Sequence, residues 1–124
     1  MGNWEIDLSL IRSWLDEQDR ETIVCITAAL NELCDVGPRL GRPLVDTVER
    51  SAFRNMKELR PPSPGRSEIR ILFAFDPSRK AVMLLAGDKS VGGTRERWSR
   101  WYARAIPRAD RLFRHYLKEL EDSQ

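Results

Sequence analysis

Seven basic residues gather in one stretch of the chain, and their types and spacing could do chemistry on phosphate. They are Lys57, Arg60, Arg66, Arg70, Arg79, Lys80 and Lys89. Cations that converge from neighbouring strands bind phosphate, and in a cleft they can stabilise the extra negative charge of a pentavalent phosphorane. Such a site cleaves RNA without a metal if the ribose 2′-OH is the nucleophile and a lysine or tyrosine moves the proton. A solvated basic face is the alternative interpretation of the same residues.

Three apolar runs predict the strands that would position these cations. The runs are Met56–Leu59, Ile69–Phe75 and Ala81–Ala86, and the turn sequences between them are 61–65 (PPSPG) and 76–79 (DPSR). Gly and Pro clusters between β-branched and aromatic runs are typical of a small antiparallel meander. The stretch from Asn55 to Lys89 is therefore predicted to form the centre of the fold.

Arg70 stands out within the middle run. The even spacing of Ile69, Ile71, Phe73 and Phe75 places those side chains on one face of the strand, so Arg70 lies on the other face. An arginine is costly to bury without a partner. We therefore expect its side chain to emerge into a polar concavity.

The segments on either side of the meander predict helices and short edge strands. Leu8–Leu15 has helical apolar spacing, and a second helix is expected to begin after an N-cap at Asp19 and to end at Gly37-Pro38. These two helices are predicted to form a hairpin over one face of the sheet. Short strands are possible at Trp4–Asp7 and Leu44–Val48.

A basic amphipathic segment closes the chain. Thr94 is a plausible N-cap, and Pro107 is expected to split the segment into two helices, Thr94–Ala105 and Pro107–Glu121. Trp98, Trp101 and Tyr102 fit the apolar face of the first part. The arginines on the polar side form either a solvated face or an electrostatic footprint for RNA.

Length and composition narrow the class of protein. A chain of 124 residues and 14.4 kDa predicts one domain, residues 1–124. The composition, 41% hydrophobic and 32% charged residues, excludes a chain that is disordered throughout. No apolar run in the sequence is long enough to span a membrane. The N-terminus lacks the basic start of a signal peptide, so a cytoplasmic location without membrane contact is the default expectation.

The residues that could hold a metal are few. Cys25 and Cys34 fall in one predicted helix, about 13–14 Å apart along its axis, too far for a disulfide. Two cysteines and a single histidine, His115, do not make a zinc site. We expect buried reduced cysteines, a structural or surface role for His115, a turn role for Asp76, and no metal or other cofactor.

Charge is distributed unevenly along the chain. Residues 1–38 carry eight acidic residues against two arginines, a net charge of −6, whereas residues 39–124 carry 19 basic residues against 11 acidic ones, a net charge of +8. Such asymmetry favours a polyanionic partner for the basic part, and nucleic acid is the obvious candidate.

Six motifs of the chain resemble those of the HigB-type, phage-derived branch of the RelE/ParE toxin superfamily. In order they are WEID, GPRLGRPLVDTV, NMKELR, IRILFAFDP, LLAGDK and RWYARAIPRADRLF, and they cover nearly the whole chain. The resemblance implies an α+β, RelE-like fold. Its parts are an N-terminal helical hairpin packed on a twisted antiparallel sheet of about four strands, and a C-terminal helix.

The resemblance further implies the toxin of a type II toxin–antitoxin system, a metal-independent endoribonuclease that cleaves mRNA on the ribosome. Its partner would be a HigA-like helix-turn-helix antitoxin, and operator DNA would be bound only through the complex of the two. Lys57 would activate the 2′-OH, Arg60 and Arg70 would hold the scissile phosphate, and Lys89 would neutralise or protonate the leaving group. The expected RNA-binding residues are Arg54, Arg66, Arg79, Lys80 and Arg95.

Two other functions stay open from the sequence. The ParE branch shares the fold but inhibits DNA gyrase, so a non-nuclease toxin is one alternative. A phage-derived nucleic-acid-binding module without toxicity is the other, and for it the basic C-terminal helix would matter more than the sheet.

Overall fold

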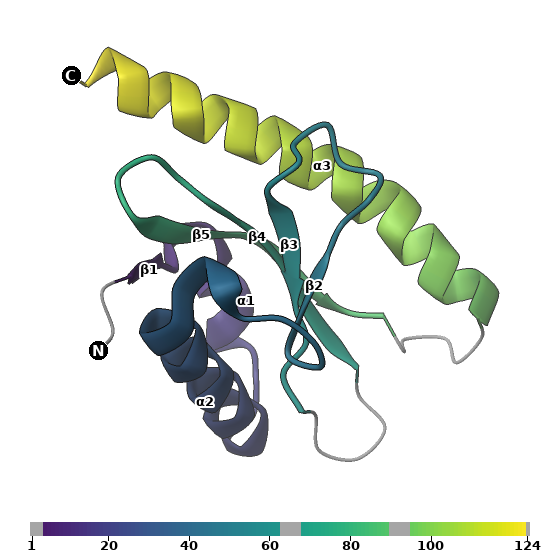
Figure 1. Cartoon of the computed structure of the whole chain (residues 1–124). Coiled ribbons are helices and arrows are strands. Elements are labelled where there is room, and N and C mark those ends of the chain that lie inside the picture. Colours follow the sequence, from purple (N-terminus) through teal and green to yellow (C-terminus); the bar gives the residue numbers. More distant parts are fainter. Residues whose placement is uncertain (1–3, 63–67, 90–94, 124) are drawn as a thin grey trace.

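The fold is a mixed β-sheet covered by helices on both faces. The computed structural model describes residues 4–62, 68–89 and 95–123, with the helix backbone alone for residues 95–98. The strands are β1 (Glu5–Asp7), β2 (Val45–Thr47), β3 (Met56–Leu59), β4 (Ile69–Phe75) and β5 (Lys80–Asp88), arranged in the order β1-β5-β4-β3-β2 (Figure 1). The α+β, RelE-like arrangement is therefore confirmed, with β4 at the centre of the sheet.

The sheet differs from its prediction in strand number and direction. Among the described residues it has five strands instead of about four, and β1 runs parallel to β5, whereas the other neighbours are antiparallel. Glu5 pairs with Lys80, far along the chain. Local periodicity cannot reveal such a partner, because pairing between distant strands depends on the topology of the whole chain.

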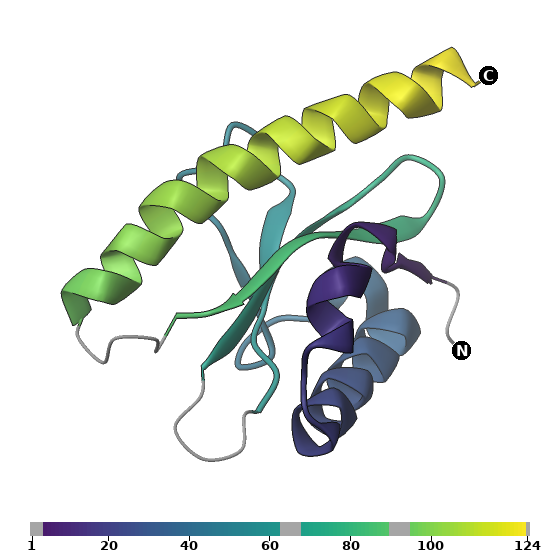
Figure 2. The same cartoon turned by 180° about the vertical axis from the view of Figure 1, so that it is seen from behind.

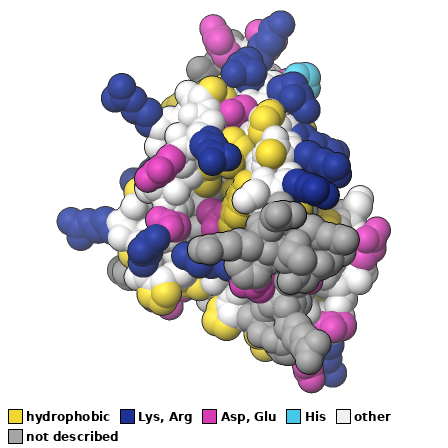
Figure 3. Space-filling model, turned by 90° about the vertical axis from the view of Figure 1, so that its right-hand side faces the viewer, with side chains coloured by type: hydrophobic (Ala, Val, Ile, Leu, Met, Phe, Trp, Pro, Cys, Tyr) yellow, Lys and Arg dark blue, Asp and Glu magenta, His cyan; other side chains and the backbone are white. Residues whose placement is uncertain are grey.

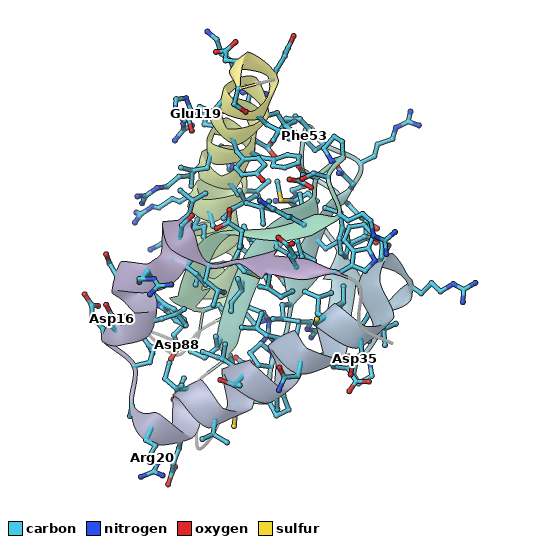
Figure 4. The ribbon with its side chains drawn as sticks, turned by 90° about the vertical axis from the view of Figure 1, so that its left-hand side faces the viewer. Asp16, Arg20, Asp35, Phe53, Asp88 and Glu119 are labelled. Carbon is cyan, nitrogen blue, oxygen red and sulfur yellow. The ribbon has the colours of Figure 1, made fainter. Side chains whose placement is uncertain are left out.

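Helices occupy the two faces of the sheet separately. A 3₁₀ turn, Ser9–Ile11, leads into α1 (Arg12–Asp16) and then α2 (Arg20–Val36), and these lie on one face. The long helix α3 (Arg95–Asp122) crosses the other face (Figure 2). In Figure 4, α3 lies above the sheet and α2, from Arg20 to Asp35, lies below it. The predicted placement of the helical hairpin over one face is confirmed.

Alternation along β4 gives the protein two cores. Ile69, Ile71 and Phe73 pack with α2, while Leu72 and Ala74 pack with α3. All five side chains are at most 3% exposed. A strand buried on both faces is a near-continuous apolar run, and this explains why β4 was recognisable from its sequence.

The ends of α2 follow the predicted local chemistry. The Asp19 carboxylate accepts a hydrogen bond from the Thr22 amide at 2.8 Å, which caps the first turn. Gly37 ends the helix with φ = +70°, a conformation that favours glycine. A Cβ at this position would also meet the Trp4 indole nitrogen at 2.5 Å.

Pro107 does not split the C-terminal helix, so the prediction of two helices is wrong. The helix is continuous from Arg95 to Asp122, with Pro107 exposed inside it. Proline costs an interior hydrogen bond, but on both sides of Pro107 the apolar face of α3 packs on the sheet, through Ala105, Ala109 and Phe113. Tertiary burial thus outweighs the local penalty. The predicted N-cap, Thr94, lies outside the described residues.

Two further expectations are met in part. Cys25 and Cys34 are free thiols, as predicted, but both are half-buried rather than fully buried. The Cys34 thiol donates a hydrogen bond to the Trp4 carbonyl at 3.0 Å. Within the described part of the chain, no helix has the length and apolar composition needed to cross a membrane.

Candidate functional site beneath the C-terminal helix

Arg70 lies on the α3 face of the sheet, directly opposite Gly87 of β5. The Trp101 indole covers Gly87 so closely that a Cβ there would meet Trp101 Nε1 at 2.6 Å. Glycine therefore allows α3 to approach the sheet beside Arg70. Arg70 is only 7% exposed, so the prediction that its side chain emerges into a polar concavity is wrong in that the side chain is buried, although its neighbours are polar.

The partners of Arg70 are two carboxylates and a backbone carbonyl. Its Nε lies 3.5 Å from Glu58 Oε1, and its Nη2 lies 3.7 Å from Glu68 Oε1. Its Nη1 donates to the Ile69 carbonyl at 2.8 Å, whereas Nε has no hydrogen-bond partner among the described residues. Glu58 is itself 7% exposed. The two side chains form a buried ion pair whose separation is longer than a good hydrogen bond.

Arg60 extends this cluster toward the surface. It follows β3, and its guanidinium lies 3.8 Å from both Glu58 Oε1 and Asp46 Oδ2. About a third of its side chain is exposed. Glu58 is thus shared by a buried and an accessible arginine, and of these two Arg60 is the one that can reach a ligand from solvent without rearrangement.

Lys89 enters the cluster from the end of β5. Burial, and then the positive charge of Arg70, lower the pKa of Lys89, while Glu68 and Glu58 partly oppose this shift. The Lys89 ammonium also lies 5.5 Å from the centre of the Tyr102 ring. A lysine with a lowered pKa is better suited to exchange a proton near neutral pH.

Tyr102 of α3 closes the cluster from above. Burial, followed by a hydrogen bond with Glu58 and the charge of that carboxylate, raises the pKa of Tyr102. Its hydroxyl therefore stays protonated at neutral pH and can donate a hydrogen bond.

Lys57 does not join these residues. It pairs with Phe73 in the β3–β4 register and lies on the α2 face of the sheet, where its ammonium donates to Thr47 Oγ1 at 3.1 Å. Arg70 is on the other face. The predicted convergence is therefore found for Arg60, Arg70 and Lys89 but not for Lys57, because neighbouring residues of a strand point to opposite faces.

The predicted RNA-binding residues whose side chains the structure describes do not surround the cluster either. Arg79 ends the β4–β5 turn and Lys80 begins β5, both at the far end of the sheet, and the Arg79 guanidinium lies 4.8 Å from the centre of the Trp4 ring. Arg54 precedes β3 near the same end, where Asn55 donates to the Phe75 carbonyl. Arg66 and the side chain of Arg95 lie outside the described residues.

Asp76 and His115 have the structural roles expected of them. The Asp76 carboxylate accepts hydrogen bonds from the Ser78 and Lys80 amides within the β4–β5 turn, and also from the Tyr116 hydroxyl of α3 at 2.6 Å. His115 is exposed and lies 3.0 Å from Glu119. Among the side chains that the structure describes, no three or more His, Cys, Asp or Glu residues come together to hold a metal ion.

Glu58 and Tyr102 are the site residues that the sequence analysis missed. An available signal for Glu58 was alternation, since Glu58 and Met56 must share a face of β3 just as Arg70 and Leu72 share a face of β4. Tyr102 was assigned to the apolar face of the helix, and its position over Glu58 depends on how α3 lies on the sheet. In chemical terms, the cluster offers one accessible guanidinium, a lysine with a lowered pKa and a protonated phenol.

Comparison with known proteins places the chain among phage-derived proteins. The family model described as "Phage derived protein Gp49-like" matches residues 13–114. The chain is 50% identical to "Putative toxin HigB2" of Mycobacterium tuberculosis (strain ATCC 25618 / H37Rv) over 98% of its own length, but it spans only 58% of that relative.

A second relative is covered almost completely. The chain is 44% identical to "Putative toxin HigB3" of the same organism, over 89% of this chain and 90% of that protein. These findings confirm the resemblance to HigB-type proteins that the motifs indicated. The chain belongs to the Gp49-like family of phage-derived proteins.

Proposed function

We propose that the chain is the toxin of a type II toxin–antitoxin system and that it cleaves mRNA on the ribosome. Two relatives carry toxin names, which supports the first part of the proposal. The observation that carries the second part is the meeting of Arg60, Arg70 and Lys89 at one end of the three central strands. Cations gathered in this way bind phosphate and stabilise the charge of a phosphorane.

Each residue of the cluster has a distinct proposed role. Arg60 is accessible and would hold the scissile phosphate. As the 2′-oxygen attacks phosphorus, its proton would pass to solvent water, the bond to the 5′-oxygen would break, and Lys89 would give that leaving oxygen a proton. The buried Arg70 would act through its neighbours, because its charge lowers the pKa of Lys89 and its ion pair holds Glu58.

The proposal includes the partners that a toxin of this kind requires. A HigA-like helix-turn-helix antitoxin would neutralise the chain, and operator DNA would be bound only through the complex of the two. The site of action would be the cytoplasm, where ribosomes translate mRNA. The basic balance of residues 39–124 suits a polyanionic target.

The decisive experiment is controlled expression followed by mapping of mRNA 5′ ends. Wild type is expected to arrest growth and to create new 5′ ends within coding regions. Arg60→Gln and Lys89→Met should each lower cleavage, and loss of proton transfer at Lys89 is expected to cost about 10²–10⁴-fold. Lys57→Met is the matched control, because it removes a cation of the same sheet from the opposite face. It should retain cleavage.

Three results would count against the proposal. Growth arrest with DNA-damage signalling and unchanged mRNA ends would indicate a gyrase inhibitor instead. Absence of growth arrest, with the protein folded and no antitoxin present, would indicate a non-toxic nucleic-acid-binding module. Loss of cleavage in Lys57→Met, with activity kept in Lys89→Met, would move the site to the other face of the sheet. Circular dichroism of each purified variant establishes that it is folded.

A further inference from the structure

A groove separate from the buried ion pair runs between the end of β5 and α3. Its volume is about 470 Å³, within the usual range for ligand sites. Arg100, Arg104 and Arg108 line it from the helix, and Leu85 and Lys89 line it from the strand. In Figure 3, Lys and Arg side chains form a row along one edge of this side of the molecule, next to hydrophobic surface.

The three arginines of the helix are regularly spaced and unneutralised. Successive members are four residues apart, so they rise by about 6 Å per step on nearly the same face of α3. All three are exposed, and within the described part of the chain none of them forms an ion pair. Arg42, Arg60 and Arg70, in contrast, each lie beside a carboxylate.

Trp101 supplies an aromatic surface to the same groove. It is half-buried, because one side of its indole covers Gly87, and it also lines the groove with Ala105. A row of cations beside an aromatic ring is the arrangement by which proteins hold single strands, with phosphates on the cations and a base stacked on the ring. Among the described residues that line the groove, Asp88 is the one acidic residue, and its Oδ1 accepts a hydrogen bond from the Glu68 amide.

We propose that this groove binds single-stranded RNA, with the backbone along Arg100, Arg104 and Arg108 and a base against Trp101. The inference rests on the proposed function and adds the path of the substrate. Lys89 lines the groove and also belongs to the Arg70 cluster, so a strand lying in the groove leads to the proposed cleavage site. An acidic protein segment could neutralise the arginines, but it has no flat base to place on Trp101.

The test measures binding without cleavage. The probe is a fluorescein-labelled oligouridylate with 2′-O-methyl ribose at every position, which cannot be cut through its 2′-oxygen. Its anisotropy is followed with the full chain across a salt series. The triple variant R100Q/R104Q/R108Q should bind roughly 100-fold more weakly at about 0.1 M salt, and the slope of log affinity against log salt should fall by about 2.

A second triple variant controls for net charge. R12Q/R20Q/R39Q removes the same amount of charge from exposed arginines in or next to α1, α2 and the turn after α2. It should bind the probe as the wild type does. Trp101→Leu should weaken binding by roughly 5- to 150-fold, whereas Trp101→Phe, which keeps a stacking ring, should stay near wild type.

Equal affinity of the two triple variants for the probe would overturn the inference. The inference would also be overturned if the oligouridylate did not bind and poly-glutamate bound through Arg100, Arg104 and Arg108. The groove would then be a site for an acidic protein. Because the probe resists cleavage, the outcome is independent of catalysis. Groove-dependent binding without new mRNA ends in cells would reject the proposed nuclease and leave the RNA site standing.

Discussion

At the scale of single residues, the Arg70–Glu58 pair decides how variants of this protein must be interpreted. Both side chains are at most 10% exposed, and each carries a charge that water cannot solvate. Removing one partner leaves the other charge buried with only its more distant counterion, Arg60 for Glu58 or Glu68 for Arg70, which costs more than the net stabilisation supplied by the pair. Loss of function on changing Arg70 alone would therefore mix folding with chemistry.

The first prediction concerns this pair. Arg70→Ala should lower the free energy of unfolding by about 3–5 kcal/mol, because Glu58 stays buried and loses its nearer cation, keeping only Arg60 at 3.8 Å. The double variant Arg70→Met with Glu58→Leu should recover most of that stability, since no buried charge remains. Urea denaturation followed by circular dichroism measures both effects. A single variant as stable as wild type would mean that Glu58 reaches water when Arg70 is absent.

At the scale of elements, Asp110 and Tyr116 in the C-terminal half of α3 form hydrogen bonds with the loops between the strands. Asp110 accepts hydrogen bonds from the Ser51 hydroxyl and from the Ala52 amide, the latter at 2.9 Å. Tyr116 donates to Asp76 in the β4–β5 turn. In Figure 4, Phe53 lies on the same side of the sheet as α3, and its ring centre is 5.0 Å from that of Phe113. These contacts fix the helix whose other half covers the Arg70 cluster.

The second prediction uses the contact between Tyr116 and Asp76. Burial alone would raise the pKa of Asp76, but hydrogen bonds from Tyr116, Lys80 and Ser78 outweigh it and hold that pKa below its ordinary value. A depressed carboxyl pKa stabilises the fold above the unfolded value near 3.9, and this stabilisation is lost as pH falls through the folded pKa. Tyr116→Phe should therefore cost about 1.5–3 kcal/mol at neutral pH.

The same substitution should matter less in acid. The difference in unfolding free energy between wild type and Tyr116→Phe is expected to shrink below about pH 4, as Asp76 takes up a proton in both proteins. Urea titrations at a series of pH values measure this difference. Ser123→Ala serves as a control, because it removes a hydroxyl from the exposed end of the chain. A difference that stays constant down to the acid limit would contradict the prediction.

At the scale of the whole molecule, the two cores share their strands. Residues of β4 and β5 alternate between the core with α2 and the core with α3, so neither layer can lose its packing while the other keeps an intact sheet. This arrangement supports the proposal that residues 1–124 form one domain. Because α2 and α3 pack on opposite faces of this sheet, the acidic N-terminal helices and the basic α3 expose their charges on opposite sides of the protein.

The third prediction is a single cooperative unfolding transition. Leu33→Ala in the α2 core should cost about 2–5 kcal/mol, and Phe113→Ala in the α3 core about 3–5 kcal/mol. In each variant, thermal midpoints from far-ultraviolet circular dichroism and from tryptophan fluorescence should fall together. Separate midpoints for the two probes would show that one layer unfolds alone. Val24→Ala, at a 61% exposed position on α2, is the control and should change little.

Local patterns in the sequence determined much of this protein. The bounds of β3 and β4, the cap at Asp19, the stop at Gly37 and the separation of Arg70 from the face of Ile71 were all predictable. Each follows from side-chain alternation or turn chemistry within a few residues. The motifs also showed the resemblance to HigB-type proteins, because the order of these short segments can be read from the sequence without the structure.

Tertiary structure alone decided which cations meet. Lys57 and Arg70 are both basic residues within apolar strand sequences, so the sequence gives no reason to separate them. The β3–β4 register places them on opposite faces of the sheet, and local sequence does not reveal that register. The parallel pairing of β1, the continuity of α3 through Pro107 and the position of Tyr102 above Glu58 likewise depend on distant partners. The physical reason is common to all of them: burial and pairing energies between segments far apart in the chain override local preference.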